Sequence, residues 1–316
     1  MKGKVALFTG STFSMPALQA LIQLDRLACV VIVESQGSPD TLQLIALLEQ
    51  NNIPTVQYSS TDTTSVISAL DTYQASIGIV HLFRHKLSEK IIHYFAGDIY
   101  NIHPSDLPNY KGPHPLYWQI RHGKDQCVLS VHQLTKHIDA GAIALQQKID
   151  IHPFDTLQSL SHQVSQVVPS LIHALLDQLD NNAVELVEQT KIENSPTAPR
   201  FTEKDLFINW REHASKDIVC MARAGNVDFG GARIQIDNST YQLLQATQTK
   251  GDYIGVPPGT VLEVGFNAGL VIKSGDGAVR LDVIATPYGV FDGYKFAALF
   301  NLDAGLTLHQ SKERTF

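Results

Sequence analysis

The first part of the chain alternates short apolar runs with stretches of helical periodicity, and this alternation limits the fold more than any other feature. The apolar runs lie at residues 5–9, 28–33 and 77–82, and amphipathic segments separate them. Strands that are apolar along their whole length are typical of parallel sheets covered on both faces. Strand and helix patterns in alternation indicate right-handed βαβ units. We therefore predict an α/β fold with a doubly wound, Rossmann-like parallel sheet.

The pattern changes after residue 180. Residues 190–200 are polar and contain Pro196 and Pro199, which favours a linker. Residues 201–222 have helical periodicity, and from 232 to 285 short β-type runs are divided by glycines, as in a small barrel. We predict an α/β domain over residues 1–190, a linker over 191–204 and an OB-like β-barrel domain over 205–316.

The charge balance and the cysteines argue against several classes of protein. The chain carries 24 Lys or Arg and 31 Asp or Glu, a net charge of −7, and so lacks the overall basic character of many nucleic-acid-binding proteins. Its three cysteines, Cys29, Cys127 and Cys220, are far apart, which argues against a disulfide framework and favours a reducing cytoplasm. The N-terminal residues predict a first strand rather than a signal peptide, and no run approaches the ~18 apolar residues of a membrane span. We expect a cytoplasmic protein with no membrane partner.

Polar side chains gather at the end of one predicted strand. Asn101 and His103 alternate along residues 99–103, so both side chains point to one face of the sheet. Ligands in open α/β sheets bind outside the carboxyl ends of the strands, where residues 103–115 form a turn-rich segment. Asp139 follows with Gly141, at which backbone can approach a ligand closely. Each residue alone has an ordinary structural explanation, and the combination carries the prediction.

These residue types suit the transfer of an acyl group to an amine. Amide and imidazole donors that face the developing oxyanion lower the barrier by about 3–4 kcal/mol each. A histidine near its neutral pKa can carry the proton that the amine loses. A carboxylate at Asp139 is expected to raise the pKa of His103. The candidate catalytic residues are therefore Asn101, His103 and Asp139.

The same residues belong to a longer motif. The run 101–115 (NIHPSDLPNYKGPHP), with His132 and the DAGAI of residues 139–143, closely resembles the folate-dependent formyltransferases. The resemblance implies 10-formyltetrahydrofolate as the formyl donor, Asn101 as the group that stabilises the oxyanion, and His103 as a proton carrier tuned by Asp139. It also implies two walls around the pterin ring of the donor and a pair of substrate contacts. The first wall is His85, Lys86 and Leu87, the second is Thr135, Lys136, His137, Ile138 and Asp139, and the substrate contacts are Ser105 and Lys111.

The second half of the chain resembles the C-terminal barrel of two-domain members, in the short motifs at 209–210, 222–224, 258–262 and 274–278. The members that act on methionyl-tRNA carry a long basic loop after the second strand, whereas residues 34–40 (ESQGSPD) form a short segment without a basic residue. Residues 201–316 contain eleven Lys or Arg and thirteen Asp or Glu, and nucleic-acid binding depends on cations that neutralise phosphates. We therefore predict a nucleotide-linked amino sugar as the acceptor, ahead of tRNA.

The sequence leaves alternatives. Lys111 stands where the motif usually has an arginine, and lysine cannot form the bidentate contacts of that residue. This departure, with Pro113, keeps a non-catalytic folate-binding homologue as one alternative, and a 10-formyltetrahydrofolate hydrolase, in which water replaces the amine, is another. The 13 histidines show no HExxH motif or regular spacing, so no metal is expected.

Overall fold

The computed structural model describes residues 2–33, 39–226, 231–251 and 253–308. It divides into two compact units, which are taken separately below. The first comprises Met1–Pro115, Gln126–Asp150 and Ser161–Pro199, and the second comprises Leu116–Asp125, Ile151–Leu160 and Arg200–Phe316. The predicted domain boundaries at 190 and 205 stay a prediction.

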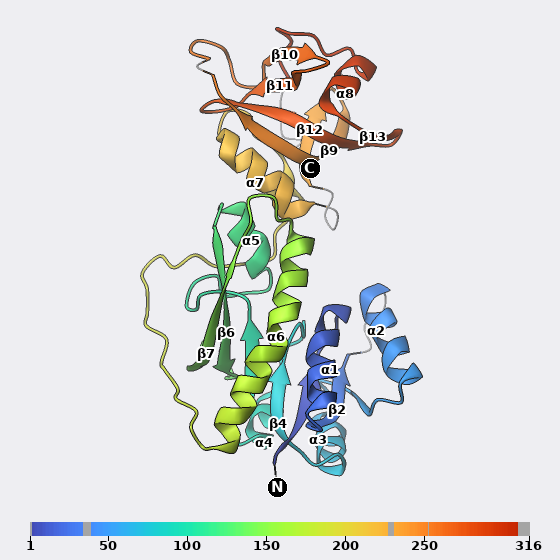
Figure 1. Cartoon of the computed structure of the whole chain (residues 1–316), viewed down its shortest axis with the longest axis vertical. Helices are drawn as coiled ribbons and strands as arrows, with labels where there is room; N and C mark the ends of the chain where they lie inside the picture. The colour runs from blue at the N-terminus through green and yellow to red at the C-terminus, as the bar shows by residue number, and fades with distance from the viewer. Residues whose placement is uncertain (1, 34–38, 227–230, 252, 309–316) are drawn as a thin grey trace. The chain divides into compact units, whose positions relative to one another are not determined.

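The first unit is built on a sheet with the strand order β3-β2-β1-β4-β5-β6-β7 (Figure 1). Its strands are β1 (Lys4–Phe8), β2 (Leu27–Ile32), β3 (Thr55–Gln57), β4 (Ala75–Val80), β5 (Ile99–His103), β6 (Gln126–Gln133) and β7 (Ile143–Asp150). The first five are parallel, whereas β6 is antiparallel to β5 and β7 is antiparallel to β6. The Rossmann-like fold is confirmed, but the sheet is mixed, because β6 and β7 each run antiparallel to the preceding strand. Residues 134–142 join β6 and β7 as a hairpin.

Helices cover both faces of this sheet (Figure 1). The helices of the first unit are η1 (Thr12–Ser14), α1 (Met15–Gln23), α2 (Pro39–Gln50), α3 (Thr63–Thr72), α4 (Glu89–Tyr94) and most of α6 (Leu157–Asp180). All of α5 (Pro115–Arg121) except its first residue, and the start of α6, belong to the second unit. Val5, Ala6, Leu7 and Phe8 of β1 are all fully buried, as expected for a central strand with helices on both sides. Pro169 lies inside α6, which continues through it from Leu157 to Asp180.

The strand order reverses between β1 and β4. Ligands of doubly wound sheets bind outside the carboxyl ends of the strands at such a point. The two segments that leave these strands approach each other, since a Cβ on Gly10 would lie 3.6 Å from the Leu82 carbonyl oxygen. The strand next to β4 is β5, so its carboxyl end, with Asn101 and His103, lies at the same edge.

The second unit is β-rich, which confirms that part of the predicted fold. Its sheet has the order β10-β11-β12-β9-β8 with β13 against β12, and every pairing in it is antiparallel. The elements are η2 (Glu203–Leu206), α7 (Ser215–Gly225), β8 (Ala232–Ile236), β9 (Ser239–Thr249), β10 (Val261–Gly265), β11 (Gly269–Lys273), β12 (Ala278–Thr286), β13 (Gly289–Phe291) and α8 (Gly293–Leu299). Trp210, Leu243, Val279 and Phe296 are among its buried core side chains.

The predicted helical stretch 201–222 is wrong in its middle. Residues 207–214 are not helical, because the Asn209 side-chain oxygen accepts hydrogen bonds from the backbone N–H groups of Arg211 and Glu212. An asparagine that caps its own turn in this way competes with helix formation. Within the described ranges, no helix is both long and apolar enough to cross a membrane.

Candidate active site

The end of β5 places the first two predicted catalytic residues. The side chains of Asn101 and His103 alternate along the strand and lie on one face, with His103 only 5% exposed. The antiparallel neighbour β6 sets His132 directly opposite Asn101. The loop from β6 to β7 then carries Asp139 back to the same place.

The three predicted residues converge on one carboxylate oxygen. Asp139 Oδ1 lies 3.7 Å from His103 Nδ1 and 3.7 Å from His132 Nε2. Asn101 Nδ2 lies 3.4 Å from the same oxygen and 3.2 Å from His132 Nε2. The second oxygen, Asp139 Oδ2, accepts a hydrogen bond of 2.9 Å from the Gly112 N–H. The structure therefore brings together residues that are up to 38 positions apart in sequence.

Backbone carbonyls fix which imidazole nitrogen carries a proton. His103 Nε2 lies 2.9 Å from the Tyr110 carbonyl oxygen, and His132 Nδ1 lies 2.8 Å from that of Gln133. A carbonyl only accepts, so both of these nitrogens must be N–H donors. In the neutral ring of His103 the lone pair is then on Nδ1, the atom that faces Asp139. This nitrogen can accept a proton.

Burial and charge act in opposite directions on His103. Burial lowers the pKa of His103 below its ordinary value and outweighs the charge of Asp139 and the hydrogen bond to Tyr110, which raise it. The nearby His132 and Lys111 lower it further. The expectation that Asp139 would raise this pKa has the right sign for that one interaction and the wrong sign for the sum, because the ring is removed from water.

Asp139 is held as a carboxylate. Burial alone would raise its pKa, but the neighbouring His132, the charge of His103 and the Gly112 N–H together hold the pKa of Asp139 below its usual value. The site at neutral pH thus contains an ionised carboxylate beside a neutral imidazole. A proton taken up by His103 would be stabilised by this charge.

The loop that carries Asp139 depends on Gly141. An added Cβ at this position would lie 1.9 Å from the Gln133 carbonyl oxygen, which is far inside van der Waals contact. We predict that Gly141→Ala destabilises the protein by about 1–3 kcal/mol through this overpacking. Urea unfolding measures the loss, with Gly265→Ala as a control, since its added Cβ would lie 3.8 Å from the nearest atom, Ala268 Cβ. Equal stability of the two variants would contradict the prediction.

The predicted folate walls lie partly around a cavity of about 330 Å³. Thr135 and Lys136 of the second proposed wall line it, together with residues of α4 and of the segment after β6 that the sequence analysis did not name: Glu89, Ile92, His93 and Leu134. Ser88, which caps α4, and the apolar pair that follows it are the signal that could have indicated this helix. His137 and Ile138 are exposed in the neighbouring loop.

The other predicted wall does not line this cavity. His85 and Lys86 are exposed, and the side chain of Leu87 is buried in the core formed by α3, α4 and the sheet. The Tyr58 hydroxyl donates a hydrogen bond of 2.8 Å to the Lys86 carbonyl oxygen and anchors the segment.

The two predicted substrate contacts have different surroundings. Ser105 is fully buried, and its hydroxyl donates a hydrogen bond of 2.7 Å to the Asn109 carbonyl oxygen. This geometry favours a role in holding the loop over contact with a substrate. Lys111 is half-buried, and its charge lowers the pKa of His103, which places it near the site.

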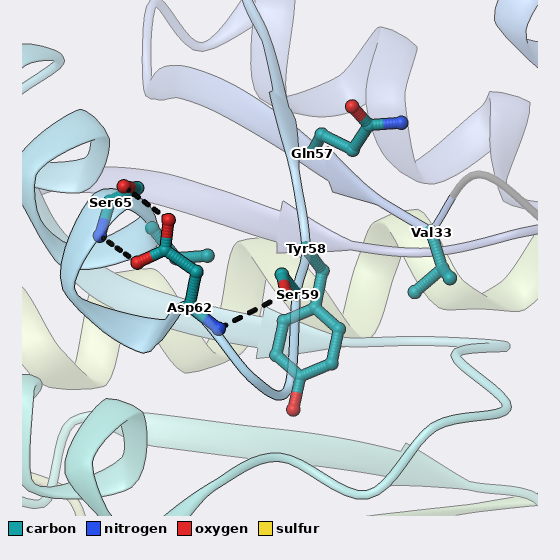
Figure 2. A pocket seen from close by; sticks show the side chains of 7 residues that line it. Val33, Gln57, Tyr58, Ser59, Asp62 and Ser65 are labelled. Carbon is teal, nitrogen blue, oxygen red and sulfur yellow. Dashed lines mark hydrogen bonds between the residues drawn. The ribbon is translucent and has the colours of Figure 1, made fainter.

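A second cavity, of about 400 Å³, lies where β3 ends and α3 begins (Figure 2). Asp62 caps α3 there, because its carboxylate accepts hydrogen bonds from the Ser65 N–H and hydroxyl. The cavity is lined by Val33, Gln57, Tyr58, Ser59, Asp62, Ser65 and Val66. None of the predicted catalytic residues is among them. Within the part of the chain that the structure describes, no cluster of three or more His, Cys, Asp or Glu side chains could hold a metal ion.

Several known proteins are similar to this chain in sequence and in fold. Residues 3–176 match the family model described as formyl transferase, and residues 200–289 match that of the formyl transferase C-terminal domain. A methionyl-tRNA formyltransferase of Thermotoga maritima is 28% identical over 242 residues, which cover 77% of this chain and 75% of the relative.

Two solved structures illustrate the shared fold. WlaRD, a sugar 3N-formyl transferase solved in the presence of dTDP and 5-N-formyl-THF, is 22% identical, with a TM-score of 0.66 over 88% of this chain and 97% of its own. An N-formyltransferase from Helicobacter canadensis, in complex with folinic acid and dTDP-3-aminofucose, is 19% identical, with a TM-score of 0.68 over 92% of this chain and 100% of its own.

Proposed function

The chain belongs to the formyl transferase family, and from this premise we propose that it transfers the formyl group of 10-formyltetrahydrofolate to the primary amine of a nucleotide-linked amino sugar. The observation that carries the proposal is the convergence of Asn101, His103 and Asp139 around one carboxylate oxygen. A half-buried amide donor, a basic imidazole nitrogen and an ionised carboxylate are the groups that acyl transfer to nitrogen needs.

Each side chain has a defined role in this reaction. The amine nitrogen attacks the formyl carbon, a C–N bond forms, and the formyl oxygen becomes negative. Asn101 Nδ2 donates to that oxygen, which stabilises the charge in a site largely closed to water. His103 Nδ1 accepts the proton that the attacking nitrogen loses and returns it to the folate nitrogen as the bond between that nitrogen and the formyl carbon breaks. The products are a formamide and tetrahydrofolate.

Asp139 stabilises the protonated state of His103. Its Oδ1 lies 3.7 Å from the nitrogen that takes the proton, and its low pKa keeps it ionised. The attraction between carboxylate and imidazolium exists only after the proton has moved, so it lowers the energy of the charged intermediate more than that of the resting state. Because His103 is neutral in the resting state, its Nδ1 is free to accept a proton at neutral pH.

The cavity beside α4 has the chemistry to bind the donor. Ile92 and Leu134 offer an apolar wall for a planar ring, while Glu89, Thr135 and Lys136 supply polar groups at its rim. Four of the six lining residues, Glu89, His93, Thr135 and Lys136, are polar or charged, and such groups can orient a heterocycle against an apolar wall. The exposed Lys136 would favour the carboxylates of the folate tail.

The choice of an amino sugar over tRNA as the acceptor rests on the charge of the chain. The segment 34–40 contains no Lys or Arg, although residues 34–38 lie outside the described part of the structure. The second half of the chain is also slightly acidic, which disfavours a tRNA backbone. The sugar N-formyltransferases among the solved structures with this fold support the sugar. Methionyl-tRNA is the second candidate, because the curated relative from Thermotoga maritima acts in that reaction by its name.

A direct assay distinguishes the acceptors. The purified protein is mixed with 10-formyltetrahydrofolate and with either charged methionyl-tRNA or a panel of nucleotide-linked amino sugars, and release of tetrahydrofolate is followed. We expect release with an amino sugar, loss of that release in Asn101→Ala, and none with tRNA. Release of tetrahydrofolate only with methionyl-tRNA would show that tRNA, not an amino sugar, is the acceptor. Release without any amine would indicate a hydrolase.

A further inference from the structure

A segment that overlaps the start of the predicted linker, residues 191–204, lies against both loops of the proposed active site. It begins at Val187, which exchanges two backbone hydrogen bonds with Ile143 at 2.8 and 2.9 Å. It continues to Ala198, which pairs with the loop after β5. We call residues 187–198 the strap. All of these contacts lie within the first unit.

Gln189 holds the loop that carries Asp139. Its side-chain Nε2 donates to the Asp139 carbonyl oxygen at 3.0 Å and to the Gly141 carbonyl oxygen at 2.8 Å. One amide group therefore binds two backbone carbonyls of the loop. Asp139 has a φ of 48°, a left-handed conformation that is unfavourable for residues other than glycine. Such a conformation persists only where surrounding contacts enforce it.

The other end of the strap holds the loop that positions His103. Pro196 accepts from the Tyr110 N–H, and the Tyr110 carbonyl in turn accepts from His103 Nε2. The Ser195 hydroxyl lies 3.1 Å from the Pro108 carbonyl oxygen and 2.9 Å from Asn109 Oδ1. The strap therefore holds the residue that fixes the tautomer of the proposed base.

The strap also fixes the contact between the two loops. The Ala198 N–H donates to the Lys111 carbonyl at 2.7 Å, and Gly112 packs so closely that an added Cβ would lie 2.5 Å from the Ala198 oxygen. The Gly112 N–H then donates to Asp139 Oδ2 at 2.9 Å. One segment thus holds both partners of this hydrogen bond.

We infer that the strap, residues 187–198, sets the relative position of His103 and Asp139, and that Gln189 is a positioning residue for the reaction. The inference rests on the proposed formyl transfer and adds to it a group that touches neither donor nor acceptor. Apart from the bonds between Val187 and Ile143 at the start of β7, the strap contacts described above end on the loop that carries Asp139 or on the loop after β5.

The variant Gln189→Met tests the inference. Methionine has nearly the same length and no N–H donors, so the variant removes both hydrogen bonds without adding a charge. We expect kcat to fall about tenfold, while the KM for 10-formyltetrahydrofolate changes less than about twofold. Gln235→Met is the matched control, because Gln235 donates to the Asp237 carbonyl in the second unit, and its kcat should equal that of the wild type.

A readout that needs no acceptor separates positioning from simple stability. The His103 ring is titrated by NMR, with its signal assigned from the spectrum of His103→Gln. The charged and titratable groups that act on it are Asp139 on the β6–β7 loop, His132 on β6 and Lys111 on the strap-bound loop. Displacement of Asp139 in Gln189→Met should lower the pKa of His103 below that of the wild type, since the carboxylate favours the imidazolium.

The outcomes are distinct. A wild-type kcat and an unchanged His103 titration in Gln189→Met would overturn the inference, and so would a lower melting temperature with an unchanged titration. If Gln189→Met does not fold, Ser195→Ala, which removes one hydroxyl at the other end of the strap, should still lower kcat about threefold; an unchanged kcat would then overturn the inference. If the wild type releases no tetrahydrofolate with any amine, the proposed function fails, while the titration still decides whether the strap positions His103.

Discussion

Replacing His103 with alanine is expected to lower kcat by roughly 10²–10³-fold, with little change in the KM for 10-formyltetrahydrofolate. The imidazole is the basic group whose free nitrogen faces Asp139, and its other nitrogen is committed to the Tyr110 carbonyl. Without it, the ammonium that forms on attack must lose its proton to water in a site that is largely closed to solvent. Asn101→Ala is expected to cost a similar factor, because the oxyanion loses its amide donor. Initial rates of tetrahydrofolate release measure both.

The matched control is His173→Ala, which removes an exposed histidine on α6 and should leave kcat unchanged. The unfolding transition of each variant is measured beside its rate, so that a loss of stability is told apart from a loss of chemistry. Near-normal rates in both His103→Ala and Asn101→Ala would remove the assignment of the catalytic site. A lower kcat in His103→Ala alone would support His103 as the base and would reject Asn101 as the donor to the oxyanion.

The sequence predicted the elements whose signals are local. The apolar runs that became β1, β2 and β4 are each buried on both faces, and a run of that kind has few other stable positions in a protein. The alternation of Asn101 and His103 along one strand was likewise a local pattern with a single geometric meaning. The long-range neighbour Asp139 came from the motif, since no spacing rule brings it to β5.

The strap could not be predicted in the same way. Residues 187–198 are mostly polar, contain Pro196 and no glycine, and have almost no regular secondary structure. Their position follows from hydrogen bonds such as that of Gln189 with Asp139, which join residues 50 positions apart and leave no periodic signal. The polar composition that predicts a linker is the same composition that supplies these donors and acceptors.

The net direction of the His103 pKa shift could not be predicted from the motif, for a related reason. The sequence shows that a carboxylate is available, and this correctly gives the sign of one interaction. It does not show that β6, the loop after β5 and the strap-bound residues enclose the ring, so the larger effect of burial was missing. Charge pairs can be proposed from motifs, whereas desolvation follows from the packed structure.

The same effect makes a second histidine a determinant of acid stability. His81 directly follows β4, is 1% exposed, and has a pKa lowered to about 4, chiefly by burial and against a smaller opposite effect of the Ile102 backbone. In the unfolded chain a histidine takes up a proton near pH 6.5, whereas the folded protein does not until about pH 4. Between these values the unfolded state binds more protons, so the free energy of unfolding falls as the pH falls, by about 1.4 kcal/mol per unit.

We expect His81→Leu to remove this dependence. Above pH 6.5 the histidine is neutral in both states and contributes no slope, so wild type and variant should run parallel there. Below it the wild type should lose about 3 kcal/mol more than the variant by pH 4. Urea unfolding followed by circular dichroism at half-unit steps from pH 4 to 7.5 measures the difference, and His173→Leu is the exposed control that should keep the wild-type slope. The comparison cancels contributions from Asp139 and the other acidic groups, which are present in all three proteins, so curves that stay parallel down to pH 4 would show that His81 is not the buried neutral histidine that its position demands.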